Sequence, residues 1–223
     1  YLAISTNKYG IYLIEKKNYK ILYQNEEKVN EDVINYKSLQ QFLDKNIFKI
    51  EKFTGKFVKN IFAVIENEKI LNIHIGIKKK NYHDVIDSKY LEQTLAETKN
   101  LFKKNYQDQN IMHMIVNNYL INGKKYNFFD DDLKTKDICL EVKFISISNN
   151  FAYQLEMILE KYQININKYL NEKYIKNFFS GHEFDFPVMI CKILQGSNQN
   201  EIQLVAKNVE NKGLFEKFFQ LFS

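Results

Sequence analysis

The middle of the chain carries the clearest alternation of hydrophobic and polar positions. Residues 70–77 alternate at the two-residue period of a strand that is buried on one face. Residues 88–102 then place apolar side chains at helical spacing, with Ser88 as the expected N-terminal cap because Glu92 lies within its reach. This stretch therefore predicts a strand followed by an amphipathic helix.

Two more strands and a second helix follow in the pattern. Residues 111–116 form a hydrophobic run, and residues 118–121 continue it to an Asn-Gly turn. Residues 138–145 alternate like a strand, and residues 150–162 place apolar side chains on one side of a helix. The predicted order is thus strand, helix, strand, strand, helix.

The part of the chain before this block predicts a small sheet and a helix. Residues 2–5 and 11–14 are the expected strands of a hairpin, and residues 21–23 are a third strand. Residues 35–53 carry apolar positions at helical spacing, and residues 57–65 predict another strand.

The part after the block is less regular. Residues 166–179 predict a strand or a helix that packs back on the first part of the chain. Asp185 is the expected cap of a short helix, with Pro187 in its first turn and Gly196 at its end. Residues 197–211 are polar and predict, in part, a linker.

The central block resembles the inserted subdomain of FtsA, the actin-related bacterial cell-division protein. The matched positions, in one order along the chain, are IMHMI at residues 111–115, YLING at 119–123, LEVKFIS at 140–146, and a helix over 155–166. Val116 departs from the family, which has Pro at that place. The resemblance implies an α+β (mixed α/β) fold, with a partial actin-like lobe, an inserted three-stranded strand-helix-strand-strand subdomain and a C-terminal amphipathic helix.

The same resemblance implies a division of the chain into four segments. The expected segments are a partial actin-like first lobe at residues 1–68, the inserted subdomain at 69–163, a return segment and linker at 164–211, and a membrane-targeting helix at 212–223.

The first hairpin stands where FtsA and other actin-like ATPases have a phosphate-binding loop resembling LDIGTSK. Here residues 2–8 are LAISTNK. Ala3 replaces the Asp that holds the metal water, and Ser5 replaces the Gly that lets backbone amides approach a phosphate. Thr6 and Lys8 alone do not make a nucleotide site, and a second glycine-rich phosphate loop is not found. We therefore expect a degenerate phosphate loop, no bound cofactor, no catalytic residue and no enzymatic activity.

The C-terminal residues have a strongly amphipathic pattern. At 100° per residue, the large apolar side chains fall on one arc, which comprises Leu214, Phe215, Phe218, Phe219, Leu221 and Phe222. Lys212 and Lys217 add positive charge that favours anionic lipid. The pattern predicts a helix that lies in a membrane interface, as in FtsA proteins. The alternative is a terminal helix docked on the core of its own protein.

Charge and composition exclude several other classes. The net charge of +5 comes from 32 basic residues that are all Lys, and specific nucleic-acid recognition relies on bidentate Arg. The four His residues lack the spacing of a metal site, and the acidic run 130–132 lacks the spaced oxygen ligands of a calcium loop. Cys139 and Cys191 are predicted to be buried thiols. No apolar run approaches the ~20 residues that span a bilayer.

The resemblance implies a non-catalytic adaptor that tethers division proteins to the cytoplasmic face of the bacterial inner membrane at the division site. The implied partners are an FtsN-like downstream division protein, FtsZ, the membrane surface and further copies of the chain, without nucleic acid. Two alternatives remain open. One is an actin-like interaction module of the pilus-assembly type, and the other is an active actin-like ATPase, against which Ala3 and Ser5 argue.

Overall fold

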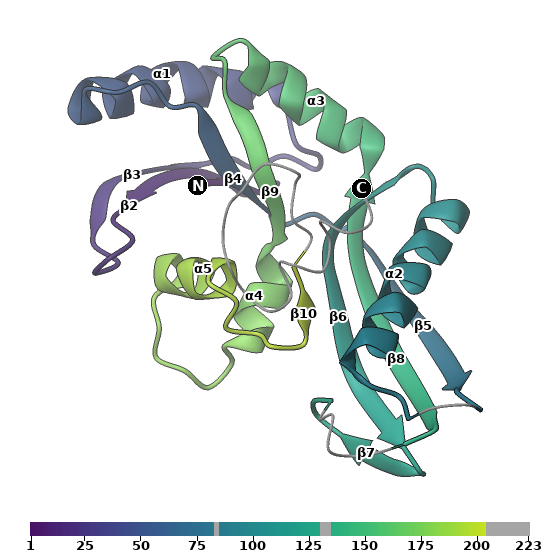
Figure 1. Cartoon of the computed structure of the whole chain (residues 1–223). Coiled ribbons are helices and arrows are strands. Elements are labelled where there is room, and N and C mark those ends of the chain that lie inside the picture. The colour runs from purple at the N-terminus through teal and green to yellow at the C-terminus, as the bar shows by residue number, and fades with distance from the viewer. Residues whose placement is uncertain (83–84, 130–134, 204–223) are drawn as a thin grey trace. The chain divides into compact units, whose positions relative to one another are not determined.

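The computed structural model describes residues 1–82, 85–129 and 135–203 (Figure 1). Its contacts divide the chain into two compact units. The first unit consists of Tyr1–Ile70 and Ile147–Ser197, and the second contains Leu71–Ser146 and, at the end of the described chain, residues 198–203. Within the expected insert of residues 69–163, the second unit ends at Ser146, because the helix that follows Ser148 packs within the first unit.

The first unit is built on a five-stranded sheet with the order β3-β2-β1-β4-β9. Its strands are β1 (Leu2–Ile4), β2 (Lys8–Ile14), β3 (Ile21–Lys28), β4 (Asn60–Ile65) and β9 (Asn165–Asn171). β1 pairs antiparallel with β2 and parallel with β4, and β4 pairs parallel with β9. The carboxyl ends of β1, β4 and β9 therefore lie at the same edge of this sheet.

Helices cover both faces of the first sheet (Figure 1). They are α1 (Tyr36–Thr54), α3 (Asn149–Glu160), α4 (Glu172–Phe178) and α5 (Phe186–Leu194). On the face toward α4 and α5, Ala3 and Val64 share a hydrophobic cluster with Ile190. On the face toward α1, the ring of Tyr9 lies 6.1 Å from that of Phe42. Alternate residues of each strand thus fill two separate cores.

The second unit contains a sheet with the order β10-β6-β8-β5, and β7 pairs with β6. Its elements are β5 (Leu71–Lys80), α2 (Ser88–Asn105), β6 (Gln109–Ile121), β7 (Lys124–Tyr126), β8 (Asp137–Ser148) and β10 (Glu201–Ile202). β5, β6 and β8 are the three predicted strands. β10 lies within the stretch predicted in part as a linker, where Glu201 pairs opposite Ile115.

α2 covers one face of the second sheet. Phe102 stacks on Phe144 of β8 with ring centroids 4.4 Å apart, and Leu95 joins Val142 in the same buried cluster. This packing explains the alternation along β5 and β8, because their apolar positions face the helix. The mixed α/β fold class predicted from the sequence is confirmed.

Local chemistry sets the ends of the helices. Asn35 caps α1 by accepting two backbone N–H groups, and Gly55 ends it at φ +67°, a conformation that favours glycine. Asp87, not Ser88, caps α2, and its side chain accepts a backbone N–H of the first turn at 2.8 Å. The predicted cap was wrong by one position because Ser88 is already the first helical residue.

Candidate functional site

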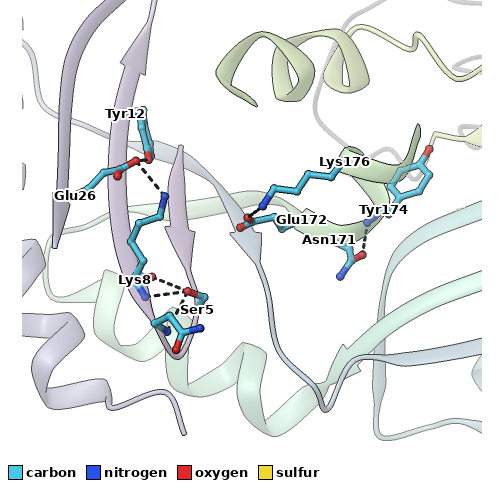
Figure 2. A network of polar contacts seen from close by, with 9 residues as sticks. Ser5, Lys8, Tyr12, Glu26, Asn171, Glu172, Tyr174 and Lys176 are labelled. Carbon is cyan, nitrogen blue, oxygen red and sulfur yellow. Dashed lines mark hydrogen bonds and ion pairs between the residues drawn. The ribbon is translucent and has the colours of Figure 1, made fainter. Parts of the chain in front are cut away.

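The candidate site lies at the edge where the parallel strands of the first sheet end, since open α/β sheets bind ligands at this edge. The residues that directly follow β1, β4 and β9 are Ser5, Glu66 and Glu172. Two polar networks of the first unit, drawn in Figure 2, surround the hairpin turn and the start of α4.

Ser5 closes the turn between β1 and β2 with its own side chain. Its Oγ accepts the backbone N–H of Asn7 at 3.3 Å and of Lys8 at 3.0 Å, and its backbone N–H donates to the carbonyl of Lys8 at 3.0 Å (Figure 2). A phosphate-binding turn offers such N–H groups to its ligand. Here the hydroxyl of Ser5 accepts both N–H groups, so these two amides already have an acceptor within the chain.

The ammonium of Lys8 is directed to β3 and away from the turn. Its Nζ lies 3.2 Å from Oε1 of Glu26, which also accepts the hydroxyl of Tyr12 (Figure 2). Glu26 lies opposite Gly10 in the β2–β3 ladder, so its carboxylate reaches the residues two positions away on either side. The hydrogen bond from Tyr12 and the charge of Lys8 hold the pKa of Glu26 below its ordinary value.

The other two positions of the degenerate loop lie apart from this network. The methyl group of Ala3 is buried in the cluster under α4 and α5, where the family's Asp would carry a charge. Thr6 is half-buried, and its carbonyl accepts the backbone N–H of Glu31 at 3.2 Å. Of the four predicted loop residues, only Ser5 and Lys8 are therefore joined by hydrogen bonds.

The start of α4 holds a second self-contained network. Oδ1 of Asn171 accepts the backbone N–H of Tyr174 at 2.7 Å and caps the helix. The largely buried Glu172 pairs with Nζ of Lys176 at 2.6 Å (Figure 2). This contact raises the pKa of Lys176. The charges of Lys8 and Glu172 are thus matched within the chain, which favours a structural role for these two residues over acid–base catalysis.

Several residues of this candidate site were not predicted from the sequence. Glu172 and Lys176 had a usable signal, because a Glu four residues before a Lys pairs on a helix. Tyr12 and Glu26 had none, because their contact depends on the register of β2 against β3.

The described histidines and cysteines do not form a metal centre. Within the part of the chain that the structure describes, no group of three His, Cys, Asp or Glu residues can hold a metal ion. His113 is fully buried, with Nδ1 2.8 Å from Oε1 of Glu201 on the neighbouring β10. Cys139 and Cys191 are free and partly exposed, so the prediction that both are buried was wrong. They lie in different units.

The predicted membrane-binding residues cannot be placed. Lys212, Lys217 and the apolar arc from Leu214 to Phe222 lie outside the described residues, as does the acidic run 130–132. Among the helices of the described ranges, none is long and apolar enough to cross a membrane.

Comparison with known proteins finds a similar fold but no matching family. No family model matches the chain, and no curated protein matches it. A chain of the PilM-PilN type IV pilus biogenesis complex has a similar structure, with a TM-score of 0.54 and 7% sequence identity. The two chains share a fold. The match covers 79% of this chain and 48% of that one, so the chain spans about half the length of the protein it matches.

Two weaker likenesses were found. The cytoplasmic domain of EpsL, an inner-membrane component of the type II secretion system of Vibrio cholerae, is 8% identical with a TM-score of 0.36, over 78% of this chain and 55% of that one. A Bacteroides thetaiotaomicron protein of unknown function with an actin-like ATPase fold is 16% identical with a TM-score of 0.35. That match covers 79% of this chain and 53% of the other. The likeness to the chain of the PilM-PilN complex supports a shared fold, and none of the three proteins is named as FtsA or as a cell-division protein.

Proposed function

We propose that this chain is a non-catalytic actin-related interaction module that works in a membrane-associated protein assembly of the pilus-assembly type. The likeness to a chain of the PilM-PilN complex supports this choice among the functions of actin-like proteins. The single observation that carries the non-catalytic part is the hairpin turn, where the hydroxyl of Ser5 accepts the amides of Asn7 and Lys8.

Three features of the first unit favour binding over turnover. The turn amides are already satisfied, Lys8 is neutralised by Glu26, and Glu172 is neutralised by Lys176. A nucleotide would have to displace Ser5 from two hydrogen bonds and would find a methyl group at Ala3. The proposed role therefore does not use energy from nucleotide hydrolysis. It depends on contacts with other proteins.

A second candidate is a cell-division adaptor at the cytoplasmic face of the inner membrane. The observation that favours it is the sequence of the C-terminal residues, where six large apolar side chains and two Lys residues form an amphipathic pattern. Crosslinking in cells separates the two candidates, because one expects pilus-assembly proteins as partners and the other expects division proteins.

Calorimetric titration with ATP and magnesium tests the non-catalytic part. We expect no saturable heat up to millimolar ATP. Ser5→Gly and Ala3→Asp together should restore the loop residues, so this double variant is the matched comparison. Micromolar binding by the wild-type protein would overturn the proposal, whereas weak binding by the double variant alone would support it.

A further inference from the structure

A groove of about 530 Å³ runs along the outer side of α3 where β9 begins. It lies within the first unit, away from the hairpin turn in sequence and in sheet position, since β9 and β2 are separated by β1 and β4. One wall is the exposed side of α3, with Tyr153, Glu156, Met157 and Glu160, and the other includes Ile166 of β9. In Figure 1, β9 is the element that follows α3 along the chain.

The wall formed by α3 exposes large apolar side chains. Tyr153 is 57% exposed and Met157 is 43% exposed, although the opposite side of the same helix buries Leu155 and Leu159 completely. A helix with one face in a core ordinarily presents polar side chains on the other. Exposed aromatic and Met side chains beside a groove are typical of a surface that contacts another protein.

The charge of the groove is opposite to that of the chain. The net charge is +5 with 32 Lys residues, yet the residues that line the groove include Glu156 and Glu160 and no Lys. Both carboxylates are exposed at the rim. Glu156 is also held in place, because its Oε1 accepts the hydroxyl of Tyr169 at 2.7 Å. The groove therefore favours an occupant with positive charge.

The strand wall offers main-chain hydrogen bonds. β9 is the last strand on its side of the sheet, among the strands that the structure describes. The backbone N–H of Asn165 points inward, where it donates at 2.9 Å to the carbonyl of Lys59, the residue before β4. Backbone groups of successive strand residues point to opposite sides, so the N–H and C=O of Ile166 face the outer edge. An open strand edge accepts an added strand from a partner.

We propose that this groove binds an extended segment of a partner protein that carries basic and apolar side chains at every second position, on the face of the segment that meets α3. The segment pairs with the edge of β9 at Ile166, places apolar side chains against Tyr153 and Met157, and presents Lys or Arg to Glu156 and Glu160. This site uses no residue of the hairpin turn, so it stands independently of the proposed function.

Fluorescence anisotropy of the full chain tests the proposal with a labelled eight-residue peptide in which Lys and Val take turns at every second position and Thr fills the positions between them. We expect saturable binding, and at least tenfold weaker binding when the Lys residues of the peptide are replaced by Glu. Glu156→Gln with Glu160→Gln should also weaken binding at least tenfold, while the amide oxygen introduced by Glu156→Gln can still accept the Tyr169 hydroxyl. Glu15→Gln with Glu183→Gln makes the same charge change at exposed positions elsewhere and should alter binding less than twofold.

A backbone variant tests the strand pairing itself. Ile166→Pro removes only an outward N–H, which edge strands tolerate, so the circular dichroism spectrum should persist while binding falls. Ile166→Val should bind like the wild type. The proposal is overturned if the peptide shows no saturable binding at 1 mM, if both double Gln variants weaken binding equally, or if a folded Ile166→Pro protein binds normally.

Discussion

Gly10 leaves the space that the ring of Tyr12 fills. A Cβ at this position would meet Cε2 of Tyr12 at 2.7 Å and its hydroxyl at 2.9 Å. Moving the ring aside would cost free energy, because it stacks on Tyr1 with ring centroids 4.4 Å apart and its hydroxyl donates to Glu26. The packing of the hairpin thus requires a residue without a side chain at position 10.

Gly10→Ala should therefore lower the free energy of unfolding by about 1–3 kcal/mol, as over-packing does. Gly76→Ala is the matched control, since nothing lies within 4 Å of its added Cβ and its backbone is an ordinary strand. It should be neutral or slightly stabilising. Urea unfolding measures both, and equal effects of the two substitutions would contradict the packing argument.

Glu26 should make stability depend on acid pH. Its pKa is lowered from 4.5 in the folded protein by the hydrogen bond from Tyr12 and by Lys8, so folding favours the charged form. That contribution is complete above the unfolded pKa and is lost as pH falls through the lowered folded pKa. Glu26→Gln should be less stable than wild type at pH 7, and the difference should shrink at pH 3.5.

Urea unfolding at the two pH values measures the change for Glu26. The control is Glu68→Gln, which alters an exposed carboxylate and should follow the wild-type pH dependence. A Glu26→Gln deficit that stays the same at both pH values would show that the carboxylate's charge does not contribute.

At the scale of elements, α2 packs on the second sheet through a large aromatic contact within a wider hydrophobic cluster. Phe102 is 1% exposed and stacks on Phe144 and Tyr106. Phe102→Ala should cost about 3–5 kcal/mol of unfolding free energy, because it opens a cavity between helix and sheet. Leu101→Ala, one residue earlier and 48% exposed, should change it by less than about 0.5 kcal/mol.

Hydrogen exchange of the β8 amides reports this unit alone. Protection should fall in Phe102→Ala and persist in Leu101→Ala. Unchanged protection in the Phe102 variant would mean that the helix is not required to stabilise the sheet.

The elements that the sequence predicted well are those whose pattern is local. The burial of β5 alternates along its whole length and that of β8 alternates up to Phe144, and α1 carries both its cap, Asn35, and its stop, Gly55. β10 was missed because two residues in a polar stretch have no period, and Glu201 is buried only through its pairing with β6. At the hairpin turn, the identity of Ser5 predicted an altered phosphate loop. Its bonds to the turn amides required the folded backbone.

At the scale of the whole molecule, membrane binding is expected to depend on the C-terminal apolar arc. Burying one Phe side chain fully is worth about 1.5–3 kcal/mol, so losing two should detach a reversible anchor. Phe215→Glu with Phe219→Glu should move the protein from the pellet to the supernatant in liposome co-sedimentation. Phe53→Glu with Phe57→Glu makes the same change at side chains that are 61% and 81% exposed, and should leave binding intact.

Circular dichroism distinguishes the two roles that the sequence allows for these C-terminal residues. A detached but folded double variant supports a membrane anchor. Loss of folding would instead mean that the residues pack on the protein's own core.

The parallel pairing of β4 with β9 has a consequence during synthesis on the ribosome. β4 ends at Ile65 and its partner begins at Asn165, so all of Leu71–Ser146 is translated between the two. At roughly 5–20 residues per second, the open side of β4 waits about 5–20 seconds for its neighbour. The nascent chain therefore exposes a hydrophobic strand with one unpaired edge over this interval, and protection by a chaperone matters most at that time.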